Sequence, residues 1–284
     1  MGRTMKQFLK PIVPCIIATG LLHNPAAAQT LSLLGETDDW RVSVAPYLFL
    51  PVTTTGTSTI AGVTADVDLD LSDVLEALNF AASTRFEVWK GDFGLMSDFY
   101  YVNLSGGSTV GLPGPGAGTA RVDIKTKQGW ASVLAGYRFL DGSYDSNSGK
   151  RRYTFDAGAG FRYNVLRQEV NANLNIDIGP GFGFQRKLGG TETWFEPVIS
   201  LRGAAEISER WTLAARADIG GFGVGGDDLQ WVVLAGADYR PWDSTSIRIG
   251  WQFYGIDFST NRADGKFAYD VFQTGPYMGL DFRF

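Results

Sequence analysis

The segment Gln273–Phe284, with the sequence QTGPYMGLDFRF, decides the fold class. Its mostly apolar set is Thr274, Pro276, Met278, Leu280, Phe282 and Phe284. Its mostly polar or small set is Gln273, Gly275, Tyr277, Gly279, Asp281 and Arg283. The two sets alternate strictly along the chain. Because successive side chains of a strand point to opposite faces, this alternation predicts an amphipathic β-strand that ends on an aromatic residue.

The first 28 residues have the pattern of a cleaved secretory signal. Arg3, Lys6 and Lys10 form a basic start, residues 11–22 form a short apolar stretch, and Ala26–Ala28 offers small residues for cleavage. The apolar stretch is too short and too interrupted by proline to span a bilayer. We therefore expect residues 1–28 to be removed and residues 29–284 to form a single domain.

Loss of the signal changes the chemistry that remains. Cys15 and His23 are the only cysteine and histidine of the chain, so residues 29–284 contain neither. The sequence thus predicts no disulfide, no His/Cys metal site and no cofactor. The 25 basic residues fall to 22 against 30 acidic ones, a net charge of −8, which argues against nucleic acid as a partner.

A period of two recurs through the rest of the chain, most clearly in residues 152–165. There Tyr153 and Phe155 precede Ala157 and Ala159 on one face, and Phe161 follows them. In an outer-membrane barrel this face contacts lipid, with aromatic residues at the two interfaces, and the other face lines a polar interior. A mean hydropathy of −0.05 fits such a division. An exported chain with this pattern is typical of the bacterial outer membrane.

The alternation predicts ten strands, at residues 40–50, 80–90, 93–104, 121–140, 151–165, 194–207, 211–220, 229–240, 245–256 and 267–284. The connections alternate in length, as periplasmic turns and extracellular loops do. The predicted fold is therefore all-β, a single transmembrane antiparallel up-and-down β-barrel of about ten strands in the cell outer membrane. Eight or twelve strands remain alternatives, because a hairpin could lie in the long loops 51–79 or 166–193. The ends Phe282 and Phe284 are expected to direct assembly by the barrel-assembly machinery.

The inward faces of these strands carry arginine and acidic residues in balanced numbers. The candidates for lining the lumen are Arg85, Glu87, Asp98, Arg138, Arg152, Asp156, Arg162, Glu196, Arg202, Glu206, Arg216, Asp218, Asp238, Arg240, Arg248 and Asp270. Arginine suits bidentate pairing with carboxylates, and unpaired charges in a narrow lumen are costly. Two hypotheses follow: the charges pair and fill the interior, or some of them line a narrow polar pathway. Inward glycines are compatible with both.

Two further segments have a predicted place in the barrel. Residues 72–78 form a short helix capped at Ser72 or Asp73, which either lies on the barrel rim or plugs the lumen. Arg121, Lys125 and Lys127 lie above the expected membrane span. They either contact lipopolysaccharide phosphates or are simply solvated, so outer-membrane lipid and lipopolysaccharide are the expected partners.

Catalysis in outer-membrane barrels depends on a small set of residue types. Lipid A deacylases, palmitoyl transferases and phospholipases of this membrane use a catalytic histidine with serine, and omptin-type proteases use an aspartate/histidine pair. Proton transfer near neutral pH usually needs such an imidazole. Because residues 29–284 lack histidine, the sequence predicts that the chain is not an enzyme.

Several segments resemble a family of uncharacterised outer-membrane β-barrel proteins of Gram-negative bacteria. They are Phe80 with residues 85–101, Ala157–Tyr163, Trp194–Pro197 with Leu201–Gly203, Asp218–Gly225, and Gly275–Leu280 before the final aromatic residue. The likeness covers about residues 40–284, and the family usually has aspartate where Glu196 stands. It implies one barrel in the outer membrane and no known substrate. Similarity to OmpA- or OmpW-type barrels is at the level of the fold only.

Two functions are therefore predicted for the barrel. The first is a narrow pore or small-solute passage lined by the paired arginine and acidic residues. The alternative is a closed barrel that acts as a structural or surface-interaction protein through its extracellular loops.

Overall fold

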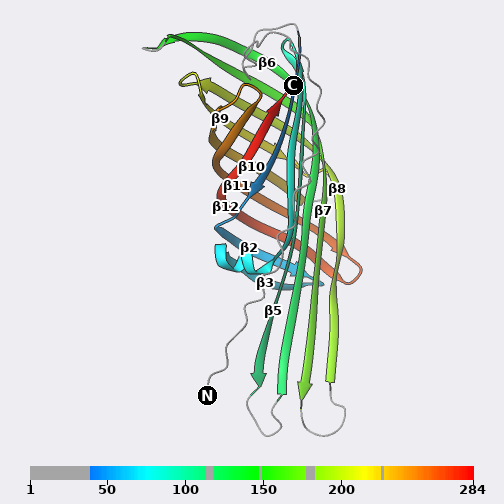
Figure 1. Ribbon diagram of the computed structural model, residues 1–284. Helices are drawn as coiled ribbons and strands as arrows, with labels where there is room; N and C mark the ends of the chain where they lie inside the picture. The colour runs from blue at the N-terminus through cyan, green and yellow to red at the C-terminus, as the bar shows by residue number, and fades with distance from the viewer. Residues whose placement is uncertain (1–38, 113–117, 147–148, 177–182, 225–226) are drawn as a thin grey trace, which may run out of the picture. The chain divides into compact units, whose positions relative to one another are not determined.

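The computed structural model describes residues 39–112, 118–146, 149–176, 183–224 and 227–284. The expected signal, residues 1–28, lies outside the described residues. The described part is an antiparallel sheet of 12 strands with one short helix (Figure 1). The strands are β1 (Trp40–Phe49), β2 (Thr53–Ile60), β3 (Val63–Asp70), β4 (Leu78–Lys90), β5 (Phe93–Leu112), β6 (Gly118–Ser146), β7 (Gly149–Ile176), β8 (Gly183–Glu206), β9 (Trp211–Gly220), β10 (Asp227–Tyr239), β11 (Thr245–Arg262) and β12 (Gly265–Arg283), and the helix is α1 (Leu71–Ala77).

The sheet closes into a ring because β1 pairs with β12. Residues 43–49 of β1 face residues 283–277 of β12, and the other edge of β1 pairs with β4. From β4 to β12 each strand pairs with the next one in the chain. The ring therefore has ten strands, β1 and the nine from β4 to β12, and the predicted fold class is confirmed.

The two remaining strands extend the first one. The backbone N–H of Leu50 donates to Pro276 at 3.0 Å and that of Val52 donates to Thr274 at 2.9 Å, so β2 continues β1 along β12. β3 then folds back on β2 as a hairpin. This hairpin lies in the predicted long loop 51–79, where the sequence analysis gave a further hairpin as an alternative. β2 is mainly threonine, so no apolar alternation marks it, whereas β3 alternates small or aliphatic residues with threonine and aspartate.

Helix α1 connects this hairpin to β4. Its N-cap is Asp70, whose side chain accepts from the Asp73 N–H at 3.0 Å, while the Asp73 carboxylate accepts from the Asp70 N–H at 3.1 Å. This reciprocal pair is a capping box with an acidic residue in each position. The helix starts one residue before the predicted range, and its cap is not Ser72 or Asp73. Only Val74 is buried, so the helix does not plug the lumen.

Aromatic side chains form two girdles on the outward face. The outer girdle contains the pairs Phe80–Tyr101, Tyr163–Phe195 and Trp231–Phe272, and the inner girdle contains Phe93–Tyr137, Phe139–Phe155 and Trp211–Tyr239. Between them the outward side chains are mostly small or aliphatic, and many are exposed, as Val133 and Ile199 are. The span on β9, Trp211–Ile219, has the length of about 9–11 residues that a tilted strand needs to cross a bilayer. This band is the membrane-spanning part.

Four neighbouring strands extend far beyond the outer girdle. β6 has 29 residues and β7 has 28, against 10 for β9, and Figure 1 shows β5–β8 projecting past the other strands. We call their projecting part the raised sheet (residues 103–112, 118–128, 166–176 and 183–193). Here the alternation reverses, since the outward face carries Lys125 and Lys127 and the inward face carries Val122 and Ile124. The charged outward face places the raised sheet outside the membrane.

Candidate functional site in the barrel lumen

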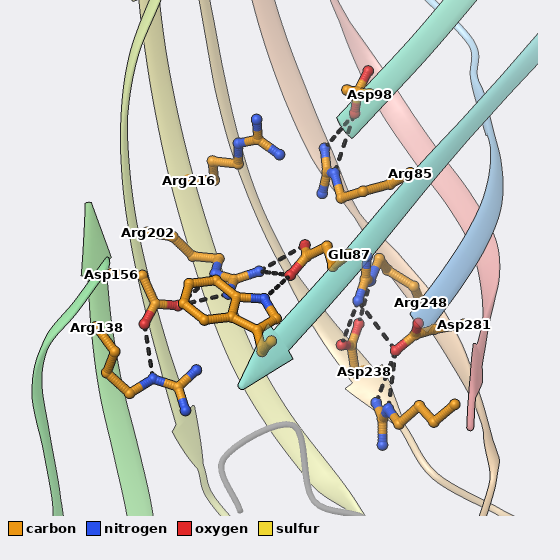
Figure 2. A network of polar contacts seen from close by, with 12 residues as sticks. Arg85, Glu87, Asp98, Arg138, Asp156, Arg202, Arg216, Asp238, Arg248 and Asp281 are labelled. Carbon is orange, nitrogen blue, oxygen red and sulfur yellow. Dashed lines mark hydrogen bonds and ion pairs between the residues drawn. The ribbon is translucent and has the colours of Figure 1, made fainter. Parts of the chain in front are cut away.

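A network of ion pairs crosses the half of the lumen nearer the periplasm, with Arg202 at its centre. Arg202 Nη1 donates to both Glu87 oxygens, at 2.7 and 2.6 Å, and its Nε and Nη2 donate to Asp156 Oδ2 at 2.9 and 2.6 Å. Figure 2 shows these three side chains pointing toward one another from β8, β4 and β7. Three strands separate β4 from β8 in the ring, so the Arg202–Glu87 pair bridges the interior. We call this network the charged layer.

Further pairs extend the charged layer around the wall. Arg138 Nε donates to Asp156 at 2.9 Å, and Trp89 Nε1 donates to Glu87 at 3.0 Å. On the other side Arg248 binds Asp238 at 2.8 Å and Asp281 at 3.5 Å (Figure 2). The remaining pairs are Arg283–Asp281, Arg85–Asp98 and Arg216–Asp218, at 3.0, 2.9 and 2.8 Å. These charges leave water together with their partners, which is the condition for a buried ion to be tolerated.

Stacked aromatic rings cross the lumen nearer the outside. The Trp130 ring lies between Tyr100 and Tyr254, with centroids 4.1 and 5.3 Å away and interplanar angles of 17° and 15°. Gln128 Nε2 also donates to the Tyr254 hydroxyl at 2.7 Å. Trp130 and Gln128 come from β6 and Tyr254 from β11, and four strands separate these two in either direction around the ring. These contacts therefore span the full width of the barrel, and we call this stack the aromatic layer.

Asp98 joins the two layers. Besides Arg85, its carboxylate accepts from the Tyr47 hydroxyl at 3.0 Å and from Trp130 Nε1 at 3.2 Å. One buried carboxylate thus serves an ion pair of the charged layer and the central ring of the aromatic layer. A carboxylate can accept about four hydrogen bonds, so Asp98 can accept from Tyr47 and Trp130 and still keep its ion pair with Arg85.

Glu196 supports the aromatic layer from β8. It is fully buried and accepts from Arg162 Nη1 at 2.9 Å and from Trp194 Nε1 at 3.2 Å. The Arg162 guanidinium lies 5.9 Å from the centre of the Trp130 ring, and Trp194 stacks on Phe258 at 3.9 Å. Polar groups with fixed partners therefore hold these rings in place.

Hairpin ends cover the lumen beyond the aromatic layer. Ser58 Oγ of β2 donates to the Gln168 side chain of β7 at 3.0 Å. Arg262, at the end of β11, donates to the Gly189 carbonyl at 3.3 Å and lies 3.5 Å from the Glu192 carboxylate of β8. The β2–β3 and β11–β12 hairpins thus reach the base of the raised sheet.

Several inward glycines make room for large side chains. A Cβ at Gly136 would lie 2.9 Å from the Trp89 ring, and one at Gly236 would lie 2.6 Å from the Tyr277 hydroxyl. A cavity of about 40 Å³ remains within the charged layer, with Arg85, Arg138, Arg202, Arg216 and Arg248 in its wall. Since one water molecule needs about 10–15 Å³, this space holds about three.

The structure brings twelve of the predicted lumen residues together inside the barrel. They are Arg85, Glu87, Asp98, Arg138, Asp156, Arg162, Glu196, Arg202, Arg216, Asp218, Asp238 and Arg248. Three others lie at the periplasmic end: Glu206 accepts from the Arg152 backbone N–H, and Arg240 donates to the Glu209 carbonyl.

Asp270 does not lie in the lumen, which corrects its prediction as a lining residue. On β12 the odd-numbered side chains Tyr269 and Val271 are buried, whereas Asp270 is exposed on the other face. It lies beyond the outer girdle, where the outward face of the barrel is polar. Of the two residues expected to direct assembly, Phe282 is half-buried and Phe284 is exposed.

The predicted lumen residues are all charged, so the prediction does not include the aromatic layer. Trp130, Trp194 and Tyr254 occupy inward positions of strands whose polar residues were already assigned inward. The alternation of inward and outward side chains along these strands therefore indicates that the three rings point into the lumen. Asp228 was missed because the strand was predicted to begin one residue later, at Leu229.

Asp228 faces Glu196 at the outer end of β10, just outside the membrane-spanning part. Burial and the nearby negative charge raise the pKa of Asp228 to about 6. Between about pH 4 and pH 6 the folded protein holds a proton that the unfolded chain has released. Stability should therefore fall as the pH rises through this window.

This effect can be measured with Asp228→Asn. We expect the wild type to gain about 1 kcal/mol of unfolding free energy, relative to Asp228→Asn, between pH 7 and pH 5, since solvent near the barrel end reduces the full effect. The measurement is urea unfolding in lipid vesicles at both pH values. Parallel pH profiles for the two proteins would contradict it.

The closed antiparallel ring, its aromatic girdles and its lipid-facing outward side define an integral β-barrel protein of the Gram-negative outer membrane. In structure the chain is similar to the outer-membrane protease OmpT of Escherichia coli, with a TM-score of 0.51 and 14% identity over 91% of this chain and 100% of that one. A weaker likeness is to the translocator domain of autotransporter NalP from Neisseria meningitidis, with a TM-score of 0.34 and 11% identity over 88% of this chain and 91% of that one. Another is to Neisserial surface protein A (NspA), with a TM-score of 0.28 and 13% identity over 86% of this chain and 97% of that one. No family model and no curated protein sequence matches the chain.

The likeness to OmpT corrects the prediction that the chain is not an enzyme. That prediction treated the lack of histidine as decisive, yet a barrel that matches 91% of this chain is a protease. Barrels of this architecture therefore include an enzyme, and the prediction does not stand. At 14% identity the likeness shows the fold alone and transfers no catalytic residue to this chain.

Proposed function

We propose that this outer-membrane barrel is closed and serves as an anchor for an extracellular interaction surface. The observation that carries the proposal is the contact of Gln128 and Trp130 with Tyr254 across the full width of the lumen. An open pathway would need these side chains to separate, and the cross-lumen pair Arg202–Glu87 would have to break as well.

The raised sheet is the surface that such an anchor would present. Its four strands stand clear of the shorter strands β9 and β10, as Figure 1 shows. Part of its inner face, Leu104, Val170 and Leu188, packs against the buried cluster that includes the aromatic layer. The closed lumen therefore also supports the base of the sheet, which favours a rigid platform over mobile loops.

Membership of the uncharacterised family that the sequence resembles is part of this proposal. Segments such as Ala157–Tyr163 and Trp194–Pro197, in their common order, support it. The resemblance does not indicate a substrate for the lumen.

Single-channel recording of the refolded protein in a planar bilayer tests the closed lumen. We expect no discrete conductance steps, because side chains of both layers meet across the lumen. Steps whose ion selectivity changes with Arg216→Ala would overturn the proposal and support the narrow pore. Insertion of the folded protein is checked by a gel in which boiled and unboiled samples migrate differently, so that silence is not mistaken for failed folding.

A further inference from the structure

The outward face of the raised sheet carries a concentration of positive charge next to the membrane. Five cations lie there on β6, β7 and β8: Arg121, Lys125, Lys127, Arg167 and Lys187. We call this set the outer basic patch. Only two carboxylates, Asp123 and Glu169, lie among them on these strands, within a chain whose net charge is −5. The patch is therefore opposite in sign to the protein as a whole.

The centre of the patch, Lys127 and Arg167, lies at the height of the headgroup region of the outer leaflet. Lys127 is two residues beyond Gly129, which pairs with Tyr101 of the outer girdle, and Arg167 is four residues beyond Tyr163 of the same girdle. At a rise of about 3.3 Å per residue on tilted strands, both lie roughly 5–10 Å past the girdle. Lipid headgroups occupy this zone.

Two cations of the patch oppose each other directly. Lys127 and Arg167 are register partners on neighbouring strands, and both point outward. Like charges in this position destabilise a sheet, unless an anion lies between them. The arginine side chain is nearly half exposed, and its planar guanidinium suits two hydrogen bonds to a phosphate.

The acidic residues of the patch do not neutralise it. Glu169 pairs with Arg167, lies 3.9 Å from Lys187 and has Lys125 as its register partner. These cations lower the pKa of Glu169, with Arg167 contributing most. One carboxylate thus serves three cations, and positive charge is left for a ligand.

We propose that the outer basic patch binds the phosphate groups of lipopolysaccharide, with Lys127 and Arg167 as its centre. Lipid is the source that the geometry favours, because the patch lies on the same outward face as the girdle and directly above it. A lipid whose acyl chains pack on the girdle carries its phosphates to this height. The proposal rests on the outer-membrane location and not on the closed lumen, so the conductance result leaves it untouched.

The test compares the full barrel with Lys127→Gln/Arg167→Gln in detergent micelles titrated with purified lipopolysaccharide. Binding is followed by the shift in thermal unfolding temperature. We expect the double variant to bind at least about tenfold more weakly, the loss expected when charge-assisted hydrogen bonds are removed. Lys150→Gln/Arg210→Gln makes the same charge change at the periplasmic turns and should bind as the wild type does.

Two further ligands identify the source of the phosphate. Dephosphorylated lipopolysaccharide should lose most of the shift, and inorganic phosphate at the same concentration should produce none. The proposal is overturned if the dephosphorylated lipid binds equally well, if inorganic phosphate reproduces the shift, or if both double variants weaken binding alike. A wild-type barrel that shows no shift with intact lipopolysaccharide would overturn it too.

Discussion

Arg202→Met is expected to lower the free energy of unfolding by about 3–5 kcal/mol, the cost of breaking a buried ion pair from one side. The substitution leaves Glu87 with the hydrogen bond from Trp89 Nε1 and leaves Asp156 with the ion pair to Arg138. Methionine fills most of the arginine volume, so the loss comes from uncompensated charge and not from a cavity. Urea unfolding of the barrel in lipid vesicles measures it.

A double variant separates charge from packing in this experiment. Glu87→Gln/Arg202→Met removes one charge of each sign, so it should be clearly more stable than Arg202→Met alone. If the double variant is the less stable of the two, the uncompensated Glu87 carboxylate is not the cause of the loss. Arg121→Met, at an exposed ion pair, is the control and should change stability by less than about 1 kcal/mol.

Trp130→Ala is expected to destabilise the barrel by about 3–5 kcal/mol, the usual cost of deleting a large buried aromatic side chain. The ring is stacked on both faces, by Tyr100 and Tyr254, and its Nε1 donates to Asp98. Its removal leaves a cavity in the aromatic layer, where side chains of β6 and β11 meet across the lumen. The same urea titration in vesicles gives the magnitude.

Two matched substitutions interpret the Trp130 result. Trp130→Phe keeps a stacked ring but loses the hydrogen bond to Asp98, so it should cost less than Trp130→Ala. Val133→Ala lies on the same strand with the side chain exposed on the lipid-facing side, and should cost far less. Equal losses for Trp130→Ala and Val133→Ala would show that the aromatic layer contributes nothing beyond ordinary strand packing.

The alternation of side chains was enough to predict the ring strands and which face of most of them points inward. It works because a membrane barrel places lipid on one face and a polar interior on the other, so one slip of register would expose every side chain to the wrong medium. Trp211–Gly220 was predicted to the residue, whereas the hairpin within residues 51–79 was not, because its first strand, β2, is mainly threonine.

Partners across the lumen were beyond the reach of the sequence. Glu87 and Arg202 are 115 residues apart, and which arginine meets which carboxylate depends on the width and stagger of the ring. The counts of the two charges showed that pairing was feasible. They did not show that Arg202 bridges two acids, or that aromatic rings meet above the charged layer.

The pairing of β1 with β12 has a consequence for how the chain reaches its final state. Residues 43–49 and 277–283 lie at opposite ends of the described sequence, so closure is the most non-local event in folding, and a slow one for that reason. Until it occurs, the sheet has two unpaired edges, each able to pair with a second molecule. Residues 268–274 of β12 also pair with β2, so the terminal strand holds both segments of the first one. Loss of the whole of β12 would therefore release both segments of the seam and favour intermolecular pairing at the freed edges.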